Sequence, residues 1–475
     1  MGELHGDERW MRNSVTMAPR GWKRFAWFGP GFIWMVSSVG SGSVLFTPRV
    51  GARYGFSLLW IALLGAFLTW VIIREIGRFT VVSGKTLLDG YRELPGPKNW
   101  AVWLIFIPGI ASGVIVVAGI SGLVGSALMI ALPGTHVLYA LGIMFGSSLL
   151  VVTGRYEKLE KVATIMAGVL VFSVLITAIL VFPEPRRLVS GLVPSIPEDF
   201  DPFFVLPWIG FLLAGAAGVM WFSYWVAARG FGGTVMEEHE SPEENSSKQK
   251  DSGRNTGIEV TVEQDRRNLL HSWLWTMGIT AGIGIVGGTV INISFLTLGA
   301  QLLMPQGIIP EGVRVAEDLT QLLTEVWGRV GFWTLIIGIV IALWGSILAN
   351  QDGWGRMFTD ATHMLIGKRI GRGIVKKILQ NRLWLRNIYV VIVLTVFPAI
   401  LFLLLRDPVL ILSAGGIISA VHMPFVVFIT LYLNRRRLSK EHRPNLFWSI
   451  VMVFVGLYYS FFAGFYFYDL FTDGG

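Results

Sequence analysis

Apolar segments long enough to cross a membrane follow one another along almost the whole chain. A helix needs about 20 mainly apolar residues to span the hydrocarbon core of a bilayer. Lipid offers no hydrogen-bond partners, so the backbone N–H and C=O groups of a spanning segment must bond to each other. A single segment of this length does so as an α-helix. The sequence therefore predicts an all-α integral membrane protein with eleven transmembrane helices, at 25–53, 57–82, 100–131, 136–153, 159–182, 203–230, 271–298, 329–352, 387–405, 408–433 and 446–470.

The charges of the predicted loops indicate how the helices are oriented. Lys and Arg are concentrated after the second, fourth, sixth, eighth and tenth apolar segments. Short cytoplasmic loops carry this excess in membrane proteins. We therefore expect the segment 1–24 in the cytoplasm, the C-terminus outside, and the chain in a plasma membrane of the bacterial inner-membrane type.

Composition argues against several other classes of protein. The net charge of +8 comes from loop residues that set topology, so it does not indicate nucleic-acid binding. The absence of cysteine excludes thiolate metal sites and cysteine nucleophiles. No phosphate-binding loop, zinc signature or nucleophile–base arrangement occurs, so we expect neither an enzyme nor a cofactor. The expected partner is the lipid bilayer, and we expect the protein to be a monomer.

The first apolar segment is interrupted near its centre by Gly40, Ser41, Gly42 and Ser43. Gly and Ser are poor helix formers, and irregular backbone at membrane depth is tolerated only where it is buried in protein or lines a cavity. Freed backbone N–H groups and the start of a new half-helix form a partly positive site without a charged side chain. The alternative is a Gly/Ser kink that allows close helix packing.

A second interruption is predicted five helices later. Interrupted helices at the first positions of two inverted halves indicate a substrate site near the bilayer midplane. A packing face of small residues is the alternative. We expect this break at about 216–221, with small and then bulky residues lining the site: Ala217, Gly218, Met220, Trp221 and Phe222.

This spacing divides the chain into two repeats. The first five-helix repeat is expected at 25–182 and the second, inverted repeat at 203–433. Within the second repeat we expect a flexible cytoplasmic loop at 231–268, because its sequence is acidic, rich in Ser and without periodicity. An external loop is expected at 299–328, and the eleventh helix, at 446–470, follows the repeats.

Several short motifs together resemble the Nramp (natural resistance-associated macrophage protein) family of divalent-metal transporters. Residues 29–32 resemble the family's GPGF opening, 54–60 its FGYSLLW stretch, 155–161 the lead into its helix 5, and 423–425 its LPF stretch. The resemblance implies a LeuT-like fold, in which an inverted 5+5 repeat contains broken helices 1 and 6. It also implies secondary active transport.

The positions that carry the family's chemistry differ in this chain. The family's Asp-Pro-Gly-Asn of helix 1 falls on residues 40–43, and its Met-Pro-His of helix 6 falls on 220–222. Gly119 and Gly122 stand where helix 3 of the family carries two acids for proton movement. Divalent Mg and Mn prefer carboxylate, carbonyl or water oxygens. The sequence therefore predicts no metal-ligand set at the helix breaks.

A neutral site beside two half-helix N-termini suits an anion better than a cation. We therefore expect a transporter of a small inorganic ion, with bicarbonate as the first candidate and nitrate or a short carboxylate next. The alternatives are a divalent cation (Mn, Mg or Fe), moved partly hydrated, and a receptor or scaffold that keeps the fold. Gln351, at the end of predicted helix 8, and His422, in helix 10, complete the candidate substrate-binding residues. The sequence does not decide whether the coupling ion is Na⁺ or H⁺.

Overall fold

The computed structural model describes residues 18–19, 21–37, 40, 42–155, 157–233, 263–366 and 381–472. These residues are nearly all helical, as spans in lipid require. Most of the predicted segments 1–24 and 231–268 lies outside the described residues, and so does Ser41. Within the described part, ten helices are long and apolar enough to cross a membrane.

The first predicted span is not among these ten because it is divided into two short helices. α1 covers Gly29–Ser37 and α2 covers Thr47–Tyr54. A π-helical turn, η3, covers Gly42–Phe46 and leads into α2. Together with this divided helix, the described part of the chain contains eleven spans, the number that the sequence predicts.

The other elements follow the predicted order. The part predicted as the first repeat continues with α3 (Leu59–Ser83), α4 (Leu87–Arg92), α5 (Trp100–Ala131), α6 (His136–Thr153) and α7 (Glu157–Leu180), and the short α8 (Pro185–Leu192) follows it. The second contains α9 (Pro202–Phe211), η4 (Leu212–Ala214), α10 (Gly215–Ala228), η5 (Phe231–Gly233), α12 (Glu263–Leu298), η6 (Gly299–Leu303), η7 (Met304–Gln306), α13 (Val315–Ile366), α15 (Arg382–Ile388), η9 (Tyr389–Val396), α16 (Phe397–Leu405) and α17 (Pro408–Arg436). The last helix is α18 (Leu446–Thr472).

α13 is longer at both ends than the sequence predicts. It begins at Val315, inside the segment expected as an external loop, and it kinks at Gly328 (φ 57°, ψ −137°). It then continues past residue 352 to Ile366. Beyond residue 352 the helix has an apolar face at helical spacing, which packs inside the protein. The residues of this face are all buried: Trp354, Met357, Phe358 and Ala361.

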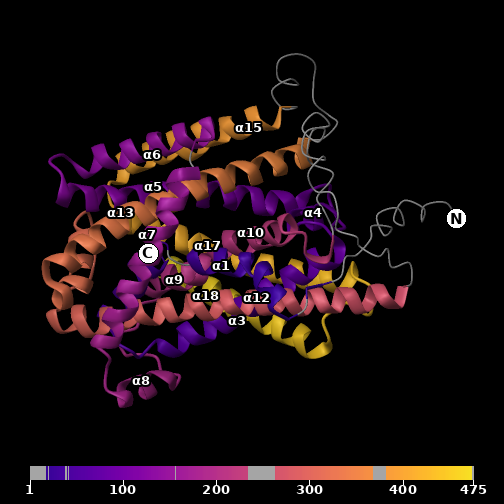
Figure 1. Cartoon of the computed structure of the whole chain (residues 1–475), viewed down its shortest axis with the longest axis horizontal. Helices are drawn as coiled ribbons and strands as arrows, with labels where there is room; N and C mark the ends of the chain where they lie inside the picture. Colours follow the sequence, from indigo (N-terminus) through magenta and orange to yellow (C-terminus); the bar gives the residue numbers. More distant parts are fainter. Residues whose placement is uncertain are drawn as a thin grey trace.

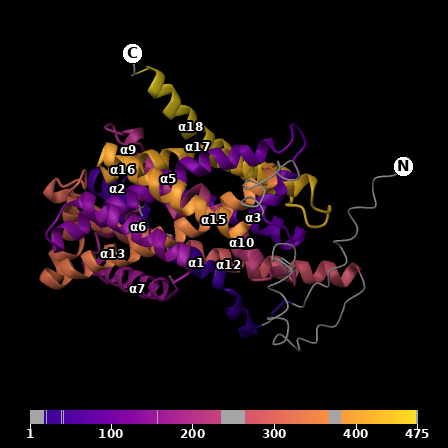
Figure 2. The same cartoon turned by 90° about the horizontal axis from the view of Figure 1, so that it is seen from above.

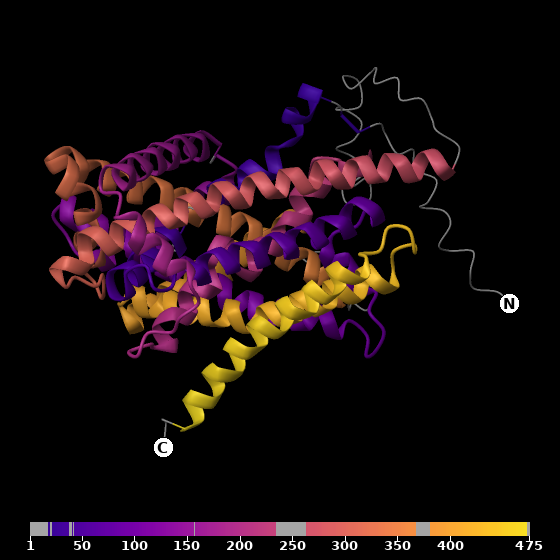
Figure 3. The same ribbon diagram turned by 90° about the horizontal axis from the view of Figure 1, so that it is seen from below.

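The divided helices lie in the middle of the bundle. Figure 1 shows α1, α10 and α17 at the centre, with α5, α6 and α13 on one side and α3 and α12 on the other. Consistent with this view, α17 packs against α5 and α9, while α12 packs against α1 and α3. α18 packs on α17 at the outside of the bundle, and its last turns point away from it (Figures 2 and 3).

Candidate functional site

The interruption of helix 1 lies against the end of the first half of helix 6. Gly42 opens η3, and a Cβ atom placed on it would lie 2.6 Å from the carbonyl oxygen of Phe211, the last residue of α9. The rings of Phe46 and Phe211 stack with their centroids 5.8 Å apart. The close approach of the two backbones therefore requires glycine at 42. A positive φ angle is not the reason, since Gly42 has none.

The interruption of helix 6 lies at 212–215. Leu213 has left-handed backbone angles (φ 56°, ψ 46°), and Gly215 follows with φ 63°. A left-handed non-glycine residue is strained by about 1–2 kcal/mol, and here the surrounding packing holds it, with Leu213 only 2% exposed. The predicted position at 216–221 is wrong. α10 is helical from Gly215 onward, because the alanines after Gly215 are strong helix formers.

A serine of α17 bridges the two halves of helix 6. The Ser419 hydroxyl accepts a hydrogen bond from the backbone N–H of Ala216 (2.8 Å) and donates one to the carbonyl of Gly210 (2.7 Å). Groups at helix ends lose their usual helical partners, and this hydroxyl replaces them. Sequence reasoning missed Ser419, for which the one available signal was a hydroxyl residue in an apolar helix that also contains Ser413.

Replacing Ser419 with alanine is expected to destabilise the junction. Ser419→Ala leaves a buried N–H and a buried carbonyl without their hydroxyl partner, at about 1–3 kcal/mol. We expect a lower melting temperature in detergent and slower transport after reconstitution. Ser413→Ala is the matched control, because Ser413 lies on the same helix but lines a cavity. Equal melting temperatures for the two variants would contradict this role.

The predicted binding residues of α10 point in different directions. Phe222 is fully buried and packs edge-to-face against Trp34 of α1, with ring centroids 5.8 Å apart. Trp221 packs instead against Trp354 of α13, at 5.4 Å. The structure therefore brings Phe222 to helix 1 and Trp221 to helix 8. The remaining three residues are buried or half-buried on the same helix: Ala217, Gly218 and Met220.

Gln351 does not face the junction. Its side-chain amide donates hydrogen bonds to the carbonyl of Leu394 (3.0 Å) and to the hydroxyl of Thr395 (3.1 Å), both in η9. It also donates to the carbonyl of Met144 in α6 (3.4 Å). This face of α13 turns toward α6 and η9, where the amide satisfies carbonyl groups. That Gln351 lines the path stays a prediction.

His422 lies on α17 beside the backbone of Leu104 in α5. Its side chain is buried, and within the described part of the chain its Nε2 has no hydrogen-bond partner. The two glycines of α5 have a packing role: a Cβ on Gly119 would lie 2.4 Å from the Leu412 side chain, and one on Gly122 would lie 2.3 Å from the Phe402 side chain. Acidic side chains at these two positions would not fit this packing.

The junction is electrically neutral where the structure describes it. Residues 42–47 and 208–222 contain no acidic, basic or histidine residue. Ser43 is 1% exposed, and the backbone N–H of Val44 donates to the carbonyl of Gly40 (3.0 Å), itself half-buried. The described residues form no group of three or more His, Cys, Asp or Glu side chains that could hold a metal ion. Backbone groups, hydroxyls and the indole N–H groups of Trp208 and Trp221 are therefore the polar groups of the described junction.

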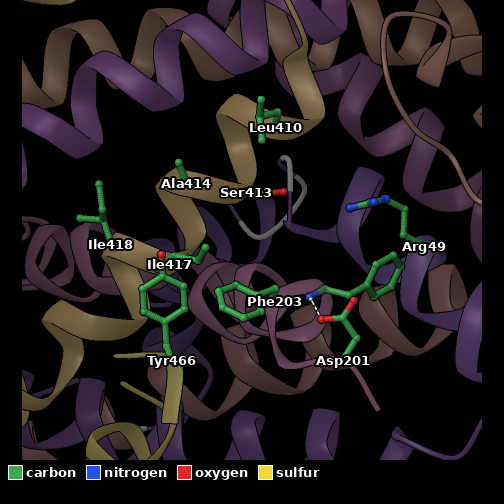
Figure 4. A pocket seen from close by; sticks show the side chains of 10 residues that line it. Arg49, Asp201, Phe203, Leu410, Ser413, Ala414, Ile417, Ile418 and Tyr466 are labelled. Carbon is green, nitrogen blue, oxygen red and sulfur yellow. Dashed lines mark hydrogen bonds between the residues drawn. The ribbon is translucent and has the colours of Figure 1, made fainter. Parts of the chain in front are cut away.

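A cavity of about 640 Å³ lies between α2, α9, α17 and α18, where Arg49 and Asp201 face apolar side chains (Figure 4). Arg49 forms an ion pair with Glu311 (3.0 Å), which precedes α13. Arg53 pairs with Asp201 (3.1 Å), the N-cap of α9. Both arginines of α2 are thus paired with carboxylates from later in the chain, which partly neutralise their charge at this cavity.

Two interrupted helices that meet inside a membrane-spanning bundle define a class of protein, the secondary transporters with a binding site at mid-membrane depth. The profile of one family, described as "Natural resistance-associated macrophage protein-like", matches residues 31–468. The chain belongs to the Nramp family, as its motifs suggested.

The relatives agree with this assignment. The chain is 24% identical over 438 residues to the "Divalent metal cation transporter MntH" of Chromohalobacter salexigens, covering 90% of this chain and 86% of that relative. A solved manganese transporter of Eremococcus coleocola superposes with a TM-score of 0.69 at 15% identity, over 98% of this chain and 92% of that one. Mhp1, a nucleobase-cation-symport-1 family transporter, superposes with a TM-score of 0.52 at 13% identity, over 92% of this chain and 85% of Mhp1. The fold is LeuT-like, as expected.

Proposed function

We propose that this protein is a secondary active transporter that carries a small inorganic ion by alternating access through the junction of its two divided helices. The observation that carries the proposal is the contact between the two interruptions, Gly42 against Phe211, in a chain of the Nramp family. Broken helices with their free backbone groups build the substrate sites of this class.

The halves of the divided helices pair in a way that suits such a cycle. α1 packs against α10, and α2 packs against α9. Within the second pair, Arg53 of α2 binds Asp201, the N-cap of α9. Arg49 joins the same pair to Glu311, which precedes α13. α10 is held separately, because Ser223 accepts a hydrogen bond from the backbone N–H of Leu87 (3.2 Å). Both pairs also pack against α12 and α17, and we infer that the strained segment around Leu213 is the hinge between them.

The names of the relatives support a divalent metal cation as the cargo. Similar proteins are described as divalent metal cation transporters and as manganese transporters. Because the described part of the junction supplies no carboxylate, the ion would keep part of its hydration shell there. Mg²⁺ and Mn²⁺ accept water and carbonyl oxygens as ligands, and Mg²⁺ loses water reluctantly. On this proposal the cargo crosses partly hydrated.

A small anion such as bicarbonate is the second candidate cargo, and a specific observation favours it. The described junction is neutral, and α10 begins there with its N-terminus. Helix N-termini and free N–H groups bind anions without any charged side chain. None of the relatives named above is described as an anion transporter, so this candidate depends on site chemistry alone.

Flux measurements on the reconstituted protein test both cargoes. Proteoliposomes are supplied with radiolabelled Mn²⁺ or with labelled bicarbonate, and uptake is compared with protein-free liposomes. The proposal predicts saturable uptake of the divalent cation. Uptake of bicarbonate alone would replace the first cargo with the second. If neither ion enters faster than in empty liposomes, the assignment of transport through this junction is contradicted.

A further inference from the structure

The cavity beside α18 extends from charged groups at one side to mainly apolar side chains at the other. Figure 4 shows Arg49 and Asp201 on one side, with Ile418 and Tyr466 on the opposite side. Lining residues of α17 occur from 410 to 418, and α17 itself begins at 408. At a rise of about 1.5 Å per residue, this stretch covers about 12 Å. The cavity therefore starts near the end of a membrane-spanning helix and extends to the depth of lipid chains.

The cavity lies where α18 separates from the rest of the bundle. Tyr466 belongs to the last turns of α18, which point away from the other helices (Figures 2 and 3). Its ring meets that of Phe203 of α9 edge-to-face, with centroids 5.1 Å apart. Two lining residues are exposed, Leu410 by 56% and Phe203 by 37%. Exposed apolar surface of this kind marks contact with a membrane or a partner, and on a spanning bundle it adjoins the lipid.

The charged side of the cavity has hydrogen-bonding capacity left over. A guanidinium carries five N–H donors, yet among the described residues that of Arg49 makes one hydrogen bond, from Nη2 to Glu311 (3.0 Å). The Arg49 side chain is only 7% exposed, and its Nε has no hydrogen-bond partner within the described part. The Asp201 carboxylate accepts from Arg53 and from the backbone N–H of Phe204. A carboxylate has about four acceptor positions, so this one can accept further hydrogen bonds.

We propose that this cavity binds one phospholipid with an ethanolamine headgroup. The phosphate accepts hydrogen bonds from the Arg49 guanidinium, whose planar group suits phosphate. The ammonium group donates to Asp201, and the acyl chains continue between α17 and α18 into the bilayer. A choline headgroup has no N–H to donate to the carboxylate, and a purely anionic headgroup would be repelled by it. One cation and one carboxylate at the same side of the cavity therefore favour a zwitterionic headgroup with N–H donors.

This lipid site is independent of the cargo. None of the lining residues of the cavity belongs to the junction at 42–47 and 208–222. Lipid binding can therefore be measured whether or not the protein moves an ion, and a failure of one proposal leaves the other standing.

The test is the melting temperature of the purified full-length protein in detergent micelles that contain dioleoyl phosphatidylethanolamine, phosphatidylcholine or phosphatidylglycerol. A ligand that binds only the folded state stabilises it increasingly with concentration. We expect a saturable rise with the ethanolamine lipid, at a concentration about tenfold lower than with the other two. O-phosphoethanolamine, which has the headgroup without the chains, should produce no shift. Equal shifts with the three lipids, or an equal shift with O-phosphoethanolamine, would overturn the proposal.

Asp201→Asn tests the recognition of the headgroup. Asn is also a good N-cap residue, so α9 keeps its cap while the cavity loses its carboxylate. The variant should respond to the ethanolamine and choline lipids at the same concentration. Asp199→Asn is the matched control, because it removes the same charge two residues away, outside the cavity. A preference for ethanolamine that survives in Asp201→Asn would contradict the role of this carboxylate.

Ala414→Trp tests the apolar side of the cavity and covers the case in which Asp201→Asn does not fold. The indole would fill space between α17 and α18 without changing any charge. The variant should lose the shift with all three lipids. Leu404→Trp is the control for an added ring, because Leu404 of α16 is 75% exposed and does not line the cavity. A wild-type lipid response in Ala414→Trp would overturn the site.

Discussion

Gly40→Asp is expected to increase the affinity for Mn²⁺ by about a hundredfold or more and to eliminate any bicarbonate uptake. A carboxylate about 4 Å from a unit charge contributes about 4 kcal/mol at the effective dielectric of a protein site, with the sign set by the ion. The wild-type junction has no such group where it is described. Uptake of labelled Mn²⁺ and of labelled bicarbonate, measured against concentration, gives both affinities.

Gly40→Asn separates the effect of charge from that of size. The amide matches the carboxylate in shape but carries no charge, so it should change neither affinity by more than a small factor. If the two variants behave alike, the effect is steric and the ion does not pass close to residue 40. Opposite shifts for the two ions in Gly40→Asp would place the cargo at the interruption of helix 1.

Gly210→Ala is expected to prevent normal folding of the bundle. A Cβ atom at this position would lie 1.8 Å from the carbonyl oxygen of Gly416, so the backbones of α9 and α17 would have to separate. Overpacking of this kind destabilises by about 1–3 kcal/mol or more, and neither atom belongs to a flexible side chain. The yield of monodisperse protein and its melting temperature should both fall sharply.

The matched control for this substitution is Gly278→Ala. Gly278 lies in α12, and a Cβ there would meet nothing within 4 Å. Alanine also has the higher helix propensity, so this variant should fold at least as well as the wild type. Similar losses in both variants would mean that the contact between Gly210 and Gly416 is not what limits the packing.

Much of the fold could be predicted from the sequence, because few kinds of structure can span a lipid bilayer. Apolar length sets the number of spans, and the Gly-Ser run at 40–43 lies between α1 and α2, where helix 1 is divided. The second interruption was misplaced because the small residues after Gly215 also form a regular helix. The strain at Leu213 depends on packing from other helices, and no local pattern indicates it.

The candidate site was less predictable than the fold. Phe222 packs against Trp34 of helix 1. Gln351 turns toward η9, because the direction of a polar side chain on a long helix depends on neighbours distant in sequence. Ser419 was missed for a related reason. It is a common hydroxyl residue whose importance arises only because a segment more than a hundred residues away brings backbone groups to it.

The central claim is that the ion passes the junction of the two divided helices, and a unique thiol tests it directly. The chain contains no cysteine, so Ser43→Cys places a single thiol beside the break, where the native side chain is 1% exposed. The measurement is the rate at which a membrane-impermeant thiol reagent modifies it from each side of the membrane, with and without cargo. The account predicts that the thiol is reached from both sides in turn, that cargo slows its modification, and that modification stops flux. A thiol that stays unreactive from both sides while the variant transports normally, or one whose modification leaves flux unchanged, would contradict it.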